Sequence, residues 1–288
     1  MSGLHGLDQL GSPDTIVAES SGPAGMIDAA TVTSAFARGR IRTRIQYSQI
    51  RDTRVTVSGV PNNHANVSAL NGGPPDPRET FGMRLYFVRH GESEANIRQV
   101  FSNFNRDPSH GLTDRGRAQV ERLAEQLVGI PFAAFYSSPV LRARQSAEIL
   151  SARLGVDYVV APALAEYDVG ELEGRSDAAS WRRYYEVRDA WFRDKNWSAR
   201  IRGGESFDDI RARFVPFIDG LLALHRPGPA LLLGHGGTFH CMLPIILSNV
   251  SFELVVEHGM GHTSVVIAEQ QAHGLECIQW GETGRPGR

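Results

Sequence analysis

From residue 83 onward, short apolar runs alternate with longer segments in which apolar residues recur every three or four positions. A short continuous apolar run is typical of a strand buried in a sheet, and the longer periodic segments are typical of amphipathic helices. The pattern therefore predicts strands at residues 84–88, 132–136, 157–160, 230–234, 264–270 and 275–280. Because the last two are close neighbours in the sequence, we expect them to pair across a turn at residues 272–274.

Helices are predicted between these strands. The periodic segments lie at residues 114–127, 139–154, 176–194, 205–225 and around 237–247. Thr113 is the expected N-cap of the first helix. Ser138 is the expected N-cap of the second, because Pro139 then occupies the first helical position, where proline is favoured. Strands that alternate with helices predict an α/β fold, a three-layer sandwich with a mostly parallel sheet and helices on both faces.

Residues 1–82 have a different composition. They carry seven arginines and seven acidic residues, so their net charge is 7 − 7 = 0, and they are rich in Gly, Ser, Asn and Pro. This composition predicts a partly disordered N-terminal extension, followed by a domain that spans residues 83–288. Within the extension, residues 41–60 alternate well enough to form a basic hairpin, which could dock on a partner or an anionic ligand. Met83 could also be the natural start of the protein.

The composition of the whole chain narrows the class of protein. Lys and Arg number 30 against 32 Asp and Glu, and a net charge of −2 argues against proteins that bind nucleic acids or membranes through basic residues. Cys241 and Cys277 are too few for a disulfide framework or a zinc ribbon, and they fit a reducing compartment. No apolar run approaches the ~18–20 residues of a membrane span, and the N-terminus lacks the layout of a signal peptide. We expect a cytoplasmic globular protein without nucleic-acid or membrane partners, for which a homodimer is the commonest assembly.

Side chains that could act on a phosphate group follow the predicted parallel strands, and in such sheets they gather just beyond the carboxyl ends of the strands. They are Arg89, His90, Arg142, Glu166 and His235. Arginine binds phosphate oxygens through paired N–H groups, a neutral imidazole can be a nucleophile, and a carboxylic acid can protonate a leaving oxygen. The amide of Gly236, at a helix start, would add a further donor. The sequence thus predicts a site for an anion that is attacked and protonated.

Six sequence blocks resemble, in order and spacing, the histidine phosphatase superfamily, the phosphoglycerate-mutase-like group. The blocks are LYFVRHGESEAN, GLTDRGRAQ, SSPVLRARQSAEIL, LAEYDVGELEG, GGESFDDIRARF and LLLGHGG, and they cover about residues 83–280. The resemblance implies a phosphoglycerate-mutase-like fold and a small-molecule phosphate ester as the substrate. It also implies that neither a metal nor a cofactor is needed, because arginine and histidine side chains supply the charge stabilisation that a metal would give.

The resemblance implies a catalytic role for each of the five residues. His90 would be the nucleophile and would accept the phosphoryl group as a phosphohistidine. Arg89 and Arg142 would hold the equatorial oxygens of the phosphoryl group, with His235 as a further donor. Glu166 would be the acid that protonates the leaving alcohol and then the base that activates water.

Substrate-binding residues are indicated by shorter patterns. The RHGxxxxN arrangement implies that Asn96 lines the same pocket as Gly236. Glu205 could belong to the substrate rim or could be only a helix-start carboxylate. His262 stands where relatives often place Asn, and its spacing of four from His258 resembles helical zinc ligands, but glycines between them argue against a helix and a metal site.

An aromatic-rich stretch over residues 181–197 is the most individual feature of the chain. It could be a helix packed on the core, or a partly apolar cap over the phosphate pocket for a bulky or polyanionic substrate. The arginines that would assist such a cap are Arg182, Arg183, Arg188 and Arg193.

Mutases and phosphatases of this group share the phosphohistidine step and differ in the acceptor of the phosphoryl group. Mutases typically carry a long insertion after the LxExxxGxxxG block and an HGN sequence at the second histidine. This chain has about 30 residues between Gly174 and Gly203 and reads HGG instead. The resemblance therefore implies a metal-independent phosphomonoesterase. A phosphoglycerate-type phosphomutase and a non-catalytic phospho-ligand or protein-binding module on the same fold are the alternatives.

Overall fold

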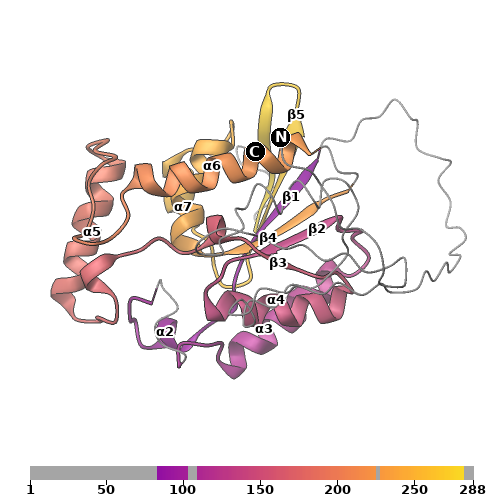
Figure 1. Cartoon of the computed structure of the whole chain (residues 1–288), viewed down its shortest axis with the longest axis horizontal. Helices are drawn as coiled ribbons and strands as arrows, with labels where there is room; N and C mark the ends of the chain where they lie inside the picture. Colours follow the sequence, from indigo (N-terminus) through magenta and orange to yellow (C-terminus); the bar gives the residue numbers. More distant parts are fainter. Residues whose placement is uncertain (1–82, 103–108, 225–227, 282–288) are drawn as a thin grey trace, which may run out of the picture. The chain divides into compact units, whose positions relative to one another are not determined.

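The computed structural model describes residues 83–102, 109–224 and 228–281, and these form a six-stranded sheet with helices on both faces (Figure 1). The strands are β1 (Arg84–Arg89), β2 (Ala134–Ser137), β3 (Val159–Val160), β4 (Ala230–Gly234), β5 (Val265–Gln271) and β6 (Gly274–Trp280). Their order in the sheet is β3-β2-β4-β1-β5-β6. The first four strands are parallel, and the β5–β6 hairpin continues the sheet in the antiparallel direction from β1.

Helices cover the two faces of the sheet because the side chains of each strand alternate between two apolar cores. Leu85 and Phe87 of β1 belong to one core, and Tyr86 and Val88 belong to the other. The second core is closed by α3 (Asp114–Leu127) and α4 (Leu141–Leu154), which lie below the sheet in Figure 1. The first core is closed by α5 (Ala178–Phe192), α6 (Phe207–Ala223), α7 (Gly236–Ile246) and α8 (Phe252–His258).

The predicted elements are confirmed with few exceptions. All six predicted strands and all five predicted helices are present, and the Thr113 side chain caps α3 by accepting a hydrogen bond from the Gly116 amide. The predicted start of α4 is wrong: the helix begins at Leu141, its N-cap is Val140, and the Ser138 hydroxyl is bonded to His235 instead. The short helices α2 (Glu94–Ile97) and α8 were not predicted, nor were two 3₁₀ turns at residues 162–164 and 170–172. The predicted extension and its hairpin, residues 1–82, lie outside the described residues.

No helix among the described residues is long and apolar enough to cross a membrane.

The first turn of α3 packs directly on the loop that follows β1, and Gly116 makes this approach feasible. A Cβ atom added at Gly116 would lie 1.9 Å from the carbonyl oxygen of Glu92. The Thr113 hydroxyl donates to the Glu92 carboxylate at 2.9 Å, so backbone packing and a side-chain bond fix the same contact. Because this loop also carries His90, the contact helps to position the strand end at which the site is built.

Two helical glycines provide a matched test of this packing. We expect Gly116→Ala to lower the free energy of unfolding by about 1–3 kcal/mol, because the added methyl group cannot fit without moving the backbone. The control is Gly220→Ala in the interior of α6, where nothing lies within 4 Å of the added Cβ. The free energy of unfolding of this variant should rise by about 0.5–1 kcal/mol, because alanine has a higher helix propensity than glycine. Urea denaturation measures the free energy of unfolding of both variants. If Gly116→Ala were as stable as the wild type, the close packing at Gly116 would not contribute to stability as argued.

Candidate active site

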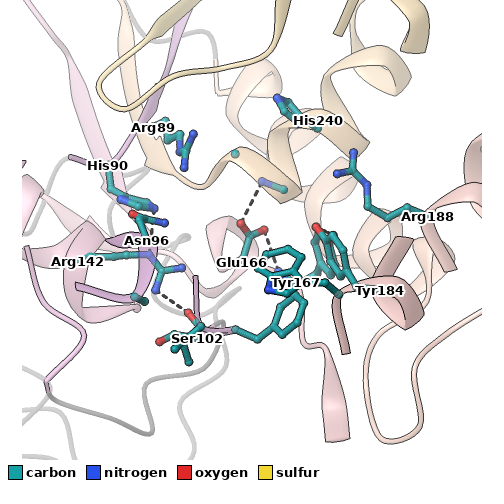
Figure 2. Close-up of a pocket in the computed structure, with 16 residues that line it drawn as sticks. Arg89, His90, Asn96, Ser102, Arg142, Glu166, Tyr167, Tyr184, Arg188 and His240 are labelled. Atoms are coloured by element: carbon teal, nitrogen blue, oxygen red, sulfur yellow. Dashed lines mark hydrogen bonds between the residues drawn. The ribbon is translucent and has the colours of Figure 1, made fainter. Parts of the chain in front are cut away.

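Side chains from the ends of three adjacent parallel strands meet in one pocket of about 230 Å³ (Figure 2). His90 follows β1, Gly236 and His240 lie on α7 (Gly236–Ile246) after β4, and Arg142 lies in the first turn of α4, after β2. The predicted site residues that line the pocket are Arg89, His90, Asn96, Arg142, Glu166 and Gly236. The convergence expected at the carboxyl ends of the strands is therefore present.

His90 is held with one ring nitrogen bonded to the backbone and the other turned toward Arg142. Its Nδ1 lies 2.6 Å from the carbonyl oxygen of Gly91, and Nε of Arg142 donates to its Nε2 at 3.0 Å. Because a guanidinium group only donates, Nε2 must carry the lone pair, and Nδ1 must carry the proton that it donates to Gly91. The geometry therefore selects the tautomer in which Nε2 is the nucleophilic nitrogen.

Arg142 links His90 to a second buried histidine. Its Nη1 donates to the backbone oxygen of Ser102 at 2.6 Å, and its Nη2 donates to Nδ1 of His235 at 3.2 Å. The other ring nitrogen of His235, Nε2, then donates to the Ser138 hydroxyl at 2.7 Å. His235 is fully buried and lies behind Arg142, and it is not among the residues that line the pocket. Its hydrogen bond orients Arg142, and its expected role as a direct donor to the phosphoryl oxygens stays a prediction.

Both histidines stay neutral at physiological pH. Burial lowers the pKa of His90 well below its ordinary value, and the nearby positive charges of Arg142 and Arg89 lower it further. The pKa of His235 falls in the same direction for the same reasons. Burial lowers the pKa of Arg142 to about 10, so this side chain keeps its positive charge at neutral pH. The site thus combines neutral imidazoles with fixed cations.

Glu166 is anchored at the N-terminus of α7. Its Oε1 accepts hydrogen bonds from the Thr238 amide at 2.7 Å, the Thr238 hydroxyl at 3.0 Å and the Tyr167 amide at 3.2 Å. Among the described residues, Oε2 accepts only from the Gly237 amide, at 3.0 Å. A Cβ atom at Gly237 would lie 2.7 Å from Oε1, so this close approach requires glycine. Because Oε2 accepts fewer hydrogen bonds than Oε1, Oε2 is the oxygen that can carry a proton for transfer.

Arg89 and Asn96 are held by a residue that sequence reasoning did not place in the site. Nη1 of Arg89 donates to the Met260 carbonyl oxygen at 2.7 Å, and its Nη2 lies 3.2 Å from Nε2 of His262. The same His262 nitrogen lies 3.1 Å from Oδ1 of Asn96, an oxygen that accepts from the Ser93 amide. In the neutral ring this nitrogen either accepts from Arg89 or donates to Asn96, according to the tautomer. Burial, followed by the charge of Arg89, lowers the pKa of His262 to about 4. The departure from Asn at this position was the available sequence signal.

The buried Nε of Arg89 has no hydrogen-bond partner among the described residues. The Gly236 amide is the first of α7 and lines the same pocket. Because the first amides of a helix lack intrahelical acceptors, both groups are donors suited to an anion.

Glu205 does not line this pocket, and its expected place on the substrate rim stays a prediction. Its carboxylate accepts from Nε of Arg213 at 2.8 Å and from the Asp168 amide at 2.9 Å. It therefore holds the chain at the start of α6, which is the helix-start role considered as the alternative.

The aromatic stretch contributes both to the core and to the wall of the pocket, and a cap for a bulky or polyanionic substrate stays a prediction. Trp191 is buried in the core, whereas Trp181 and Tyr184 line the pocket together with Phe101 and Arg188. In Figure 2, Tyr184 and Arg188 lie on the side of Glu166 away from His90.

Within the described part of the chain, no group of three His, Cys, Asp or Glu side chains is placed to hold a metal ion. His258 is the last residue of α8, and Gly259 follows with a φ of 60°, so His258 and His262 do not share a helix.

Comparisons with known proteins agree with this architecture. Residues 85–283 match the sequence model of the histidine phosphatase superfamily, branch 1. The probable phosphoglycerate mutase GpmB of Proteus mirabilis is 30% identical over 168 residues, which cover 57% of this chain and 75% of that protein. The GpmB protein of Cronobacter sakazakii is 28% identical over 169 residues, with the same coverage.

Solved structures of phosphatases resemble this chain in fold. A mycobacterial glucosyl-3-phosphoglycerate phosphatase superimposes with a TM-score of 0.59 at 25% identity, covering 69% of this chain and 99% of that one. An Escherichia coli protein described as a putative α-ribazole-5′-phosphate phosphatase has a TM-score of 0.59 at 23% identity, covering 72% and 100% of the two chains, and supports the fold alone. This chain belongs to branch 1 of the histidine phosphatase superfamily.

Proposed function

We propose that this protein is a metal-independent phosphomonoesterase that hydrolyses a small-molecule phosphate ester through a phosphohistidine at Nε2 of His90. The observation that carries the proposal is the fixed tautomer of His90, whose Nδ1 proton is donated to Gly91 and whose Nε2 lone pair faces Arg142. A neutral imidazole between fixed cations is a nucleophile already placed where a phosphate group would bind.

The residues support a two-step reaction. In the first step, Nε2 of His90 forms a bond to phosphorus while the ester P–O bond breaks, and the leaving oxygen takes a proton from Glu166 and departs as the alcohol. In the second step, Glu166 removes a proton from water, the water oxygen bonds to phosphorus, and the P–N bond breaks with its electron pair returning to Nε2. Inorganic phosphate leaves, and Glu166 is again protonated.

The donors around His90 suit the phosphoryl oxygens. A bound phosphate would offer the Arg142 N–H groups charged acceptors in place of neutral ones, and a guanidinium group can bind a phosphate through two parallel hydrogen bonds. The free Nε of Arg89 and the Gly236 amide would contribute further donors. These groups stabilise the charge of the transferring group without a metal.

A phosphoglycerate-type phosphomutase is the second candidate, because the GpmB relatives are named as probable phosphoglycerate mutases. The two activities differ in the acceptor, which is water for the phosphatase and a second hydroxyl for the mutase. Product formation that a bisphosphate stimulates, without release of inorganic phosphate, would favour the mutase.

The primary test measures phosphate release from a panel of phosphate esters in the presence of EDTA. We expect wild-type activity that EDTA does not reduce, a loss on the order of 10⁴-fold in His90→Ala, and a loss of about 10²–10⁴-fold in Glu166→Gln. His273→Ala, at an exposed position in the β5–β6 turn, is the matched control and should retain full activity. Sustained activity in His90→Ala, or complete inhibition by EDTA, would refute the proposed mechanism.

The protonation of the buried histidines gives a second test. We expect NMR titration of labelled histidine to show no inflection for His90 or His235 near pH 6.5, because burial and the arginines lower both pKa values. The unfolded chain binds these protons near pH 6.5. The contribution of the two neutral histidines to the free energy of unfolding is therefore fully present above pH 6.5. It decreases as the pH falls below 6.5, by up to about 1.4 kcal/mol per pH unit for each histidine.

Chemical denaturation at pH 7.5 and 5.5 measures the change in stability directly. The assignment of His90 is confirmed by loss of its resonance in His90→Gln. An inflection near pH 6.5 for either histidine would show that the neutral, donor-bound arrangement is not the state in solution.

The third test concerns His262 as a positioning residue. We expect His262→Ala to raise the KM about tenfold and weaken inhibition by inorganic phosphate by a similar factor, with a smaller effect on kcat, because Arg89 and Asn96 lose a shared contact. His262→Asn should restore most of the phosphate affinity, since its amide can contact both groups. His258→Ala, at an exposed position, is the control. Unchanged phosphate inhibition in His262→Ala would rule out this role.

A further inference from the structure

One turn of α4 holds His90 from two directions. Arg142 and Ser146 stand four residues apart on this helix, so their side chains leave the same face of it. Nε of Arg142 donates to Nε2 of His90 at 3.0 Å, and Figure 2 shows the two side chains next to each other. Ser146 instead holds the backbone of the following residue, Gly91. Ser146 is 1% exposed and does not line the pocket, so its place in the site is behind the nucleophile.

The Ser146 hydroxyl both donates and accepts. Its Oγ donates to the backbone oxygen of Arg142 at 2.8 Å and accepts from the Gly91 amide at 3.2 Å. A serine that bonds to the carbonyl four residues earlier in its helix keeps its side chain in one orientation. The lone pairs of Oγ are then presented to Gly91, which lies 55 residues earlier in the chain.

Gly91 is held at its amide, its Cα and its carbonyl oxygen. The amide donates to Ser146, and the Cα packs on α3, where an added Cβ would lie 2.5 Å from the carbonyl oxygen of Gly116. The carbonyl oxygen of Gly91 lies 2.6 Å from Nδ1 of His90. Gly91 is buried, so an amide that lost its acceptor would be costly there, and the backbone would rotate toward another acceptor. Such a rotation would move the carbonyl oxygen away from Nδ1.

The bond between His90 and Gly91 matters most when a phosphate ester is bound. In the free protein, Arg142 and Gly91 both fix the tautomer of His90. Attack on phosphorus uses the Nε2 lone pair, which accepts from Arg142 in the free protein. Nε of Arg142 must therefore leave Nε2, and the anionic phosphoryl oxygens would attract it. From that moment, the bond from Nδ1 to Gly91 is the contact that keeps the proton on Nδ1 and leaves Nε2 unprotonated.

We propose that Ser146 is a positioning residue for the nucleophile, because it fixes Gly91 so that Nδ1 of His90 keeps its proton and Nε2 stays free to attack phosphorus. This inference rests on the proposed phosphatase function. In the transfer step, Nε2 bonds to phosphorus, the ester P–O bond breaks, and the leaving oxygen takes the proton of Glu166. The Nδ1 proton stays in its bond to Gly91, whose fixed carbonyl dipole stabilises the positive charge that develops on the ring.

Steady-state kinetics of Ser146 variants test the proposal. We expect Ser146→Ala to lower kcat about tenfold, because part of the bound enzyme then carries the proton on Nε2. Inhibition by inorganic phosphate should change less than about threefold, since Arg89, Arg142 and Gly236 keep their donors. Ser146→Thr should restore most of kcat, because its hydroxyl can make the same bond within the helix. Ser146→Cys, whose thiol is a weaker donor and acceptor, should be intermediate.

Ser151→Ala is the matched control, because Ser151 lies further along α4, is half-buried and does not line the pocket. It should keep the wild-type kcat. A wild-type kcat in Ser146→Ala would overturn the proposal. It would also be overturned by a kcat in Ser146→Thr as low as in Ser146→Ala, or by a loss of phosphate affinity in Ser146→Ala as large as the loss of kcat.

NMR of the ring nitrogens separates the role of Ser146 from the reaction. The nitrogen chemical shift differs between a protonated and an unprotonated ring nitrogen, so it reports the tautomer of His90 directly. With saturating inorganic phosphate, we expect the wild type to keep the proton on Nδ1 and Ser146→Ala to show the second tautomer as well. Loss of the resonances in His90→Gln assigns them.

The second tautomer in Ser146→Ala would support the role of Ser146 even if no ester were hydrolysed, and such a lack of hydrolysis would refute the phosphatase proposal alone. A single, unchanged tautomer of His90 in phosphate-bound Ser146→Ala would overturn the role of Ser146 and leave the phosphatase proposal intact.

Discussion

The burial of the Arg142 guanidinium group between two neutral histidines is the interaction on which the rest of the site depends. Arg142 is 4% exposed, and the groups that accept its hydrogen bonds are His90, His235 and the Ser102 carbonyl oxygen. None of these acceptors carries a negative charge. Burying a cation whose hydrogen-bond acceptors are all neutral reduces stability, and this cation also lies at a helix N-terminus, where the macrodipole opposes a positive charge. A phosphate dianion would relieve both effects.

This arrangement explains several other features together. Burial, together with this cation, keeps both imidazoles neutral, and the hydrogen bonds that the cation donates account for the tautomer of each one. It also accounts for the local structure after β2, where the Ser138 hydroxyl accepts from His235 and α4 begins only at Leu141. Preorganised donors around a neutral nucleophile are what phosphoryl transfer requires, and here the fold builds them from the adjacent ends of three parallel strands.

The sequence pattern was sufficient for the fold because apolar runs and helical periodicity report directly on burial. It was also sufficient to bring Arg89, His90, Arg142 and Glu166 to one pocket, because topology fixes where the carboxyl ends of parallel strands lie. It was not sufficient where a side chain has competing partners. Glu205 was available to the substrate, but it is held by Arg213, which lies eight residues away on α6. His262 was missed because its contacts with Arg89 and Asn96 span more than 160 residues.

In the proposed reaction the phosphoryl group is transferred to Nε2 of His90, and the resulting phosphoenzyme can be trapped. The measurement is intact and peptide mass spectrometry after rapid mixing with a phosphate ester and an alkaline quench, because phosphohistidine is stable to alkali and labile to acid. We expect one added phosphoryl group on His90 that is lost in acid and absent from His90→Ala. Phosphate release with no phosphoenzyme at any mixing time, or a phosphoryl group on another residue, would contradict it.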